Sequence, residues 1–264
     1  MPKTFGEPGK YPDTKARKIT LSAFAVSLGA MNLMSIAFGY LSAAKAPPLG
    51  KGLAFLVWVA ASWGVIKFMD RVTTKATDER RNYLKGADGE HLVGYLLEDL
   101  PASYHLFHGL QLEAGSDIDH VAVGPGGIFL LSTKNWRGLL TVSTDGKLLH
   151  NGKLPDGGDV LQKTRRAAMM LRERLMALVG EDVYVQGVLV VPLAWTDVPS
   201  LVRNIAILRQ DNLASWIEGA PRRLDSGKVT HLATAMHALA TTALSMRENK
   251  AKVVGGQVGS TSRP

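Results

Sequence analysis

Residues 116–134 read SDIDHVAVGPGGIFLLSTK, and this stretch decides the fold of the chain. Two segments rich in β-branched and aliphatic residues flank the turn-formers Gly-Pro-Gly-Gly at residues 124–127, which can adopt the positive φ that a tight reversal needs. The pattern predicts a β-hairpin. Its second strand contains the unbroken apolar run IFLL, which is typical of a strand buried on both faces.

Four polar side chains lie near the ends of this hairpin. Because successive side chains of a strand point to opposite faces, Asp117 and Asp119 share one face of the first strand. Ser132 and Lys134 share one face of the second strand for the same reason. An ammonium group at the end of a buried strand is costly unless a carboxylate meets it. From these residues alone we favour a buried Asp119–Lys134 ion pair that holds the hairpin in register.

At these residues the sequence resembles a known family. The family pattern is GxxGE, an Asp-Ile-Asp-His strand, a Gly-Pro-x-Gly turn and a strand that ends in carboxylate-x-Lys-Asn. In this chain the matching positions are Gly86, Gly89 and Glu90, then residues 117–120, 124–127 and 132–135, with Gly138 following. This pattern resembles the nuclease-related domain, NERD, which is grouped with the restriction-endonuclease-like PD-(D/E)xK fold. The resemblance covers residues 85–195, and it departs at Ser132, where the family usually has Glu.

The resemblance implies an α/β fold with a restriction-endonuclease-like core, in which helices flank a central mixed sheet. The hydrophobic periodicity agrees with this order of elements. Besides the hairpin, we expect helices at residues 90–100, 161–178, 212–218 and 228–248, and strands at residues 104–110, 139–142, 148–150, 184–191 and 205–208. Gly86 and Gly89 are expected to interrupt the helical pattern, with Asp88 as the N-cap of the helix that follows.

The resemblance also implies a nuclease that hydrolyses phosphodiester bonds with Mg²⁺ or Mn²⁺. Mg²⁺ takes oxygen ligands, and one or two carboxylates together with a substrate phosphate suffice. Asp119 would be the central ligand, and Lys134 would orient or deprotonate the attacking water or offset charge in the transition state. The remaining implied site residues are Glu90 and Asp117 as further ligands, the backbone carbonyl of Thr133, and Gln162 close to the carboxylates.

Ser132 changes what such a site can do. A hydroxyl can occupy the ligand position but brings no negative charge, so metal affinity and water activation should both fall. Three functions stay open: a nuclease that acts on nucleic acid, with DNA as the expected substrate; a catalytically inactive module that binds nucleic acid or protein; and a scaffold that binds other proteins in a membrane assembly. His120 is not a candidate, because strand alternation turns it to the face opposite Asp119.

The first third of the chain has a different composition. Residues 1–85 contain 13 Lys and Arg against 5 Asp and Glu, so this part carries all of the formal net charge of +8. Two uncharged runs follow one another, residues 19–44 and 52–66. At about 1.5 Å per residue the first run exceeds a hydrocarbon core of about 30 Å. The second reaches spanning length if Lys51 and Lys67 extend toward the headgroups.

We therefore expect a transmembrane helical hairpin in the lipid bilayer. The alternatives are a buried helical hairpin of a soluble protein and a secretory signal peptide, which fits poorly because the first run is too long. Lys and Arg flank both ends of the hairpin and are scarce in its loop, so the positive-inside rule places both termini and the globular domain on the cytoplasmic side of the inner membrane. Much of the basic charge can serve topology and contact with anionic lipid, so the pI of about 9.7 is not taken as evidence for nucleic-acid binding.

The expected organisation has five parts. They are an N-terminal tail (1–18), the transmembrane hairpin (19–69), a juxtamembrane helical stalk (70–85), the nuclease-related domain (86–249) and a disordered tail (250–264). The chain contains no cysteine, which excludes disulfides and thiolate metal sites.

Overall fold

The computed structural model describes residues 1–43, 48–113, 116–196, 198 and 200–258. The chain divides into two compact units. The first combines Met1–Lys10 with Gly86–Pro264, and the second is Tyr11–Lys85. The first ten residues therefore belong to the globular unit, although the sequence analysis places them in a separate tail.

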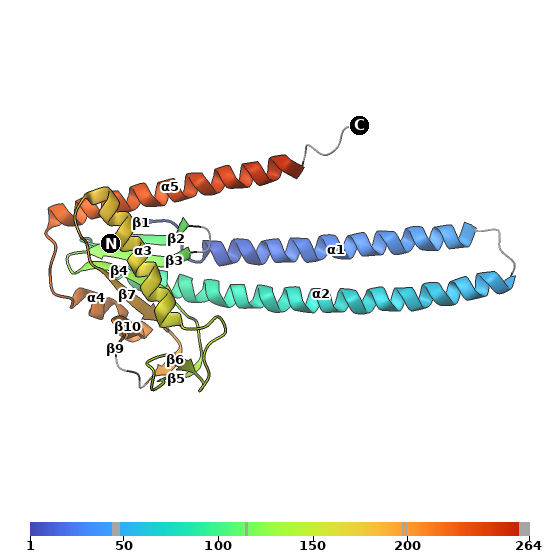
Figure 1. The fold of residues 1–264 in the computed structure, drawn as a ribbon, viewed down its shortest axis with the longest axis horizontal. Helices are drawn as coiled ribbons and strands as arrows, with labels where there is room; N and C mark the ends of the chain where they lie inside the picture. Colours follow the sequence, from blue (N-terminus) through green and yellow to red (C-terminus); the bar gives the residue numbers. More distant parts are fainter. Residues whose placement is uncertain (44–47, 114–115, 197, 199, 259–264) are drawn as a thin grey trace. The chain divides into compact units, whose positions relative to one another are not determined.

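A seven-stranded mixed sheet forms the centre of the first unit, in the order β1-β2-β3-β4-β7-β10-β9 (Figure 1). Its strands are β1 (Lys3–Phe5), β2 (His105–Glu113), β3 (Ser116–Gly124), β4 (Gly127–Thr133), β7 (Val185–Val190), β9 (Leu201–Val202) and β10 (Ile205–Leu208). The predicted hairpin is confirmed, since β3 and β4 are antiparallel and Gly124 pairs with Gly127 at the turn.

Strands β4, β7 and β10 run parallel, so their carboxyl ends lie at one edge of the sheet. We call this the carboxyl edge. Backbone hydrogen bonds continue along it beyond the strands: the N–H of Lys134 donates to the carbonyl of Val190 (2.9 Å), and the N–H of Val191 donates to the carbonyl of Leu208 (2.8 Å). The residues that follow the three strands are therefore neighbours at this edge.

Helices cover both faces of the sheet. Helices α3 (Val160–Val179) and α5 (Ser226–Val258) bury their apolar sides against one face, which includes Val121, Val123 and Leu130. The end of α2 (Pro48–Leu97), together with α4 (Leu213–Glu218), covers the other face over Ala122, Phe129 and Leu131. Because β4 contributes to both faces, its apolar run IFLL is buried throughout, as predicted.

A smaller sheet lies beside the first. It has the order β6-β5-β8 and consists of β5 (Gly138–Val142), β6 (Leu148–His150) and β8 (Ala194–Thr196). Its inner face packs Leu140, Leu148 and Ala194 against Leu189 and Ile207 of the main sheet. We call it the accessory sheet.

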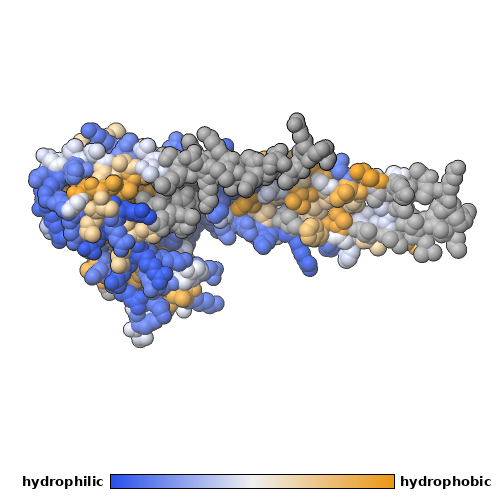
Figure 2. Space-filling view, turned by 45° about the horizontal axis from the view of Figure 1, so that its top comes forward, coloured by the Kyte–Doolittle hydropathy of each residue, from blue (hydrophilic) through white to orange (hydrophobic). Residues whose placement is uncertain are grey.

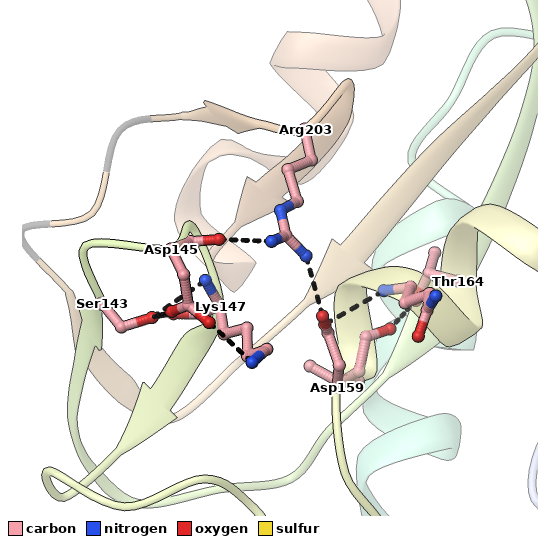
Figure 3. Close-up of polar contacts among 8 residues, drawn as sticks. Ser143, Asp145, Lys147, Asp159, Thr164 and Arg203 are labelled. Atoms are coloured by element: carbon pink, nitrogen blue, oxygen red, sulfur yellow. Dashed lines mark hydrogen bonds and ion pairs between the residues drawn. The ribbon is translucent and has the colours of Figure 1, made fainter.

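Arg203 ties the accessory sheet to the start of α3 (Figure 3). Its guanidinium donates to the carboxylate of Asp159 (Nη1 to Oδ2, 2.8 Å) and to the backbone carbonyl of Asp145. Asp159 is the N-cap of α3, and its other oxygen accepts the backbone N–H of Gln162 (3.1 Å). One arginine therefore holds the β5–β6 turn and the helix N-terminus together.

The second unit consists of α1 (Lys10–Ala43) and most of α2, which are helices of 34 and 50 residues. Among the described residues, one segment, Thr14–Ile36, is long and apolar enough to cross a bilayer. Large apolar side chains in it are exposed, among them Leu21 and Leu33, and Figure 2 shows hydrophobic residues at the surface of this unit. The second uncharged run lies in α2, partly outside the residues whose side chains the structure describes.

Three expectations differ from the structure. Helix α2 continues through Gly86 and Gly89, so the predicted break and the N-cap at Asp88 are wrong; a helix tolerates single glycines at a modest cost. Strands β1, β8 and β9 were not predicted, because each has only two or three residues, which is too few for a periodic pattern. Helix α5 covers residues 250–258, which the sequence analysis assigns to a disordered tail, because no proline interrupts it; residues 259–264 lie outside the described residues.

Candidate functional site

Asp119 lies at the carboxyl edge. It belongs to β3, near the beginning of that strand and beside the end of β4. Its Oδ2 accepts the backbone N–H of Thr133 at 2.6 Å, and the hydroxyl of Ser132 also hydrogen-bonds to this carboxylate. The residue after Thr133 is Lys134, whose charge acts on Asp119 as well. The end of the hairpin thus brings Asp119, Ser132, Thr133 and Lys134 together, as the sequence predicts.

A break in strand alternation explains how Asp119 reaches this position. Val121 packs against the face that α3 and α5 cover, so strict alternation would place Asp119 there too. Ile118 packs in that same cluster although it is three residues from Val121, so the alternation is interrupted between them. In the partner strand β2, Gly109 has a φ of +63°, a conformation that favours glycine, and it lies opposite this interruption.

Glu90, a residue of α2, lies close enough to Asp119 for the charge of Asp119 to act on it. Its Oε2 accepts the backbone N–H of Gly9 at 3.2 Å, so the N-terminal ten residues help to position it. The preceding Gly89 allows the helix to approach the end of β4. A Cβ added at Gly89 would lie 2.7 Å from the Cβ of Asn135 and 3.4 Å from Cγ2 of Thr133. The second glycine of GxxGE therefore permits the close contact that brings Glu90 to the carboxyl edge.

Replacing the two glycines of this motif should have opposite effects. Gly89→Ala is expected to lower the free energy of unfolding by about 1–3 kcal/mol, because the new methyl group would overlap Asn135. Gly86→Ala is the matched control: its Cβ would meet no heavy atom within 4 Å in the part of the chain that the structure describes. That variant should gain about 0.5–1 kcal/mol from helix propensity. Thermal unfolding of the full chain in detergent would measure both, and equal effects would contradict the close packing at Gly89.

The pKa values of both carboxyl groups are raised in the folded chain. Burial raises the pKa of Glu90 from 4.5 to about 8, and the negative charge of Asp119 adds to this, while the Gly9 N–H and Lys134 oppose it. Burial also raises the pKa of Asp119, against the opposing effects of Lys134 and the Thr133 N–H. Both residues are half-buried, and both shifts have the direction expected for carboxyl groups that lose part of their hydration. At neutral pH, Glu90 therefore retains a proton.

This shift predicts a pH dependence of stability. Between pH 4.5 and about 8 the folded chain keeps a proton on Glu90 that the unfolded chain has lost, so stability falls as the pH rises through this window. Glu90→Gln resembles the protonated form and should remove this loss, so that it is more stable than the parent by on the order of 1–3 kcal/mol at pH 8.5 and nearly equal to it at pH 4.5.

Thermal unfolding in detergent with EDTA at both pH values would measure the difference. Glu98→Gln is the control, because Glu98 is an exposed glutamate just beyond the end of α2. This control should leave the difference between the two pH values as it is in the parent. A parallel pH dependence in the parent and in Glu90→Gln would show that Glu90 does not hold the extra proton.

Three further groups were predicted for the site: Asp117, Gln162 and Thr133. Asp117 is exposed on β3, and its charge contributes least among the effects on Glu90. Gln162 is exposed near the start of α3, and the contact described for it is the backbone hydrogen bond to Asp159. The side-chain hydroxyl of Thr133 is buried and has no hydrogen-bond partner in the described part of the chain.

The oxygen donors at the carboxyl edge can be compared with the ligands that a divalent cation takes. No group of three His, Cys, Asp or Glu side chains that could hold a metal ion occurs among the described residues. Mg²⁺ needs only one or two protein carboxylates and keeps several waters. Asp119 and Glu90 are two such groups, and the charge of Asp119 raises the cost of charging Glu90, which a divalent cation would relieve. The chemistry of the donors therefore suits a hard divalent cation.

His120 has a structural partner. Its Nδ1 lies 2.7 Å from Nδ1 of His108, its cross-strand neighbour on β2, and both rings are buried. Burial lowers the pKa of His108 to about 4, and burial together with His108 lowers that of His120, so both rings are neutral. The pair belongs to the packing of β2 on β3. The sequence argument that turned His120 away from Asp119 assumed strict alternation, which is interrupted between Ile118 and Val121, so that argument does not hold.

Comparison with known proteins adds one finding. Residues 85–192 match the model of the family described as NERD, nuclease-related domain. Comparisons with curated proteins and with solved structures found no match. The matched segment contains Glu90, Asp119, Ser132 and Lys134. The part of the chain that holds both carboxylates and the lysine is therefore similar to the nuclease-related domain.

Proposed function

We propose that this chain is a membrane-anchored nuclease that hydrolyses phosphodiester bonds of nucleic acid, with DNA as the expected substrate. The observation that carries the proposal is the meeting of Glu90 and Asp119 with Lys134 at the carboxyl edge of the sheet, where the charge of Asp119 raises the pKa of Glu90 and the charge of Lys134 acts on both carboxyl groups. This edge is where open α/β sheets bind their ligands. The similarity of residues 85–192 to the nuclease-related domain supports the same function.

In this proposal Asp119 and Glu90 hold Mg²⁺ or Mn²⁺, and Asp117 and the carbonyl of Thr133 are further oxygen donors. When bound, the cation would offset charge on the phosphate and make a bound water more acidic. The Thr133 N–H orients the Asp119 carboxylate, and the Ser132 hydroxyl stabilises its charged form. Lys134 would orient the attacking water and balance the negative charge that develops on the phosphate oxygens.

Membrane attachment rests on the helices of the second unit. The Thr14–Ile36 segment of α1 would be the first span, and residues 52–66 of α2 the second. Basic residues outside these runs would keep both termini and the globular unit on the cytoplasmic side of the inner membrane. The nuclease would then act on nucleic acid close to the bilayer.

A second candidate function is a catalytically inactive module that binds nucleic acid or a partner protein. Ser132 favours it, because its hydroxyl takes the position of the usual Glu and hydrogen-bonds to Asp119 without supplying charge. A module of this kind would bind DNA with an affinity that falls steeply with salt and does not change with EDTA.

Nicking of supercoiled plasmid by the full chain in detergent distinguishes these functions. We expect nicking with Mg²⁺ or Mn²⁺ and none with EDTA. Lys134→Gln should reduce the rate at least about 100-fold, because the charge near the carboxylates is lost while the side chain keeps a similar length. Lys153→Gln, an exposed lysine of the accessory-sheet region, is the matched control and should stay within about threefold. DNA binding without any metal-dependent nicking would favour the inactive module.

A further inference from the structure

The carboxyl edge carries an exposed tryptophan beyond the matched segment. Trp195 lies on β8 and is 70% exposed, and its neighbour Leu139 on β5 is 47% exposed. Apolar side chains that are exposed and adjacent to one another can mark a binding site.

The local structure turns Trp195 outward. The preceding Ala194 is buried between the accessory sheet and the main sheet, so alternation along β8 points the next side chain away from the core. Leu139 is the register partner of Trp195 on the adjacent parallel strand, so the two side chains lie on the same outer face. Together they form a small apolar surface with an indole ring at its centre.

A cation lies against this ring. The guanidinium carbon of Arg209 is 5.4 Å from the centroid of the Trp195 ring, and its Nη2 pairs with Asp211 at 3.2 Å. Arg209 therefore holds one side of the indole, while the exposed area of Trp195 remains open to a ligand. An aromatic surface with an adjacent arginine suits a planar base that is attached to a phosphate.

This surface lies at the same edge as the candidate site. Arg209 directly follows β10, and Lys134 directly follows β4, with only β7 between these two strands. Neighbouring strands are about 4.8 Å apart, so the two strand ends are separated by about 10 Å. A stacked nucleic-acid strand rises about 3.4 Å per nucleotide, so this distance corresponds to about three nucleotides.

We propose that Trp195, Arg209 and Leu139 form a base-stacking surface that holds a single-stranded segment of nucleic acid a few nucleotides from Lys134. This inference rests on the proposed nuclease function and specifies its substrate. A single strand is required because the base faces of a duplex are stacked on one another and are closed to an indole ring. Sequence preference is expected to be weak, since every base offers a planar face.

Binding of a fluorescein-labelled 20-nucleotide oligothymidine to the full chain in detergent tests the proposal, with EDTA present so that cleavage plays no part. Trp195→Ala should weaken binding about tenfold. Trp195→Phe should recover most of the affinity, because a ring is restored. Tyr184→Ala is the matched control: Tyr184 is 57% exposed and precedes β7 at the opposite edge of the sheet. This control should bind like the parent, and duplex binding should change less than twofold in all three variants.

The outcomes separate this inference from the nuclease proposal. If Lys134→Gln loses nicking but still binds oligothymidine, the stacking proposal is supported. If Trp195→Ala binds oligothymidine as tightly as the parent, the stacking proposal is wrong even if the chain is an active nuclease. Absence of oligothymidine binding by the parent overturns it too. Tryptophan fluorescence of the chain in nanodiscs with brominated phosphatidylcholine gives a further test. If the bromine atoms quench part of this fluorescence, and Trp195→Phe no longer shows that quenching, the surface lies in the bilayer and the proposal is wrong.

Discussion

Asp119→Asn is expected to abolish metal-dependent nicking of plasmid, with a loss of at least about a thousandfold. An asparagine keeps an oxygen that can accept the Thr133 N–H, so the end of the hairpin should hold its geometry. The negative charge that would bind the cation is removed. Because the buried carboxyl group no longer has to be charged, the variant should be as stable as the parent or more stable.

The matched control for this variant is Asp99→Asn, outside the candidate site. Asp99 is exposed just beyond the end of α2, so its replacement should change the nicking rate by about threefold or less. Both variants should be assayed beside the parent with Mg²⁺, Mn²⁺ and EDTA. Nicking by Asp119→Asn at the rate of the parent would mean that the cleavage arises outside this site, and the nuclease proposal would then be wrong.

Ser132→Glu is expected to strengthen the binding of a divalent cation and to raise the nicking rate about tenfold or more at limiting Mg²⁺. The variant replaces a hydroxyl that hydrogen-bonds to Asp119 with a third carboxylate next to Asp119 and Glu90. Metal affinity increases with the number of charged oxygen ligands, so the Mg²⁺ concentration for half-maximal nicking should fall. Ser132→Gln has a similar size without the charge and should give no gain.

The same variant should be less stable than the parent when no metal is present. Three carboxylates in one partly buried place repel each other, and we expect a loss of about 1–3 kcal/mol at pH 8 in EDTA. Added Mg²⁺ or Mn²⁺ should restore thermal stability in Ser132→Glu and have a smaller effect on the parent. Equal melting temperatures with and without metal would show that no cation binds here, and Asp119, Glu90 and Lys134 would then have a structural role.

Local patterns predict much of the fold. Strands β6 and β10 have the predicted bounds, and the hairpin of β3 and β4 is confirmed, because alternation, a continuous apolar run and a glycine-rich turn all act within a few neighbouring residues. Strand β1 is different. Its three residues are held by pairing with β2, about a hundred residues away in the chain, and a short segment of this kind has no periodicity of its own.

Part of the candidate site could likewise be predicted from the sequence, and part could not. The identity of its chemical groups follows from the sequence, because Asp119 and Lys134 lie at strand ends that the hairpin itself brings together. The interruption of the alternation opposite Gly109 was missed. The register of β2 and β3 stays in step at this point, and it shifts only further along, between Gln111 and Glu113. The sequence contains the motif residues Gly89 and Glu90, but it does not predict that Gly89 packs against Asn135 or that Glu90 accepts the Gly9 N–H.

The sequence by itself therefore determined the hairpin, the central strand and the kinds of groups at its end, since these depend on residues close together in the chain. Only the tertiary structure decided that Glu90 lies near Asp119, that the Gly9 N–H holds it, and that Trp195 faces outward at the same edge. The physical reason is that a pKa and an exposed area are set by all the atoms around a group. Those atoms come from segments that the chain brings together only when it folds.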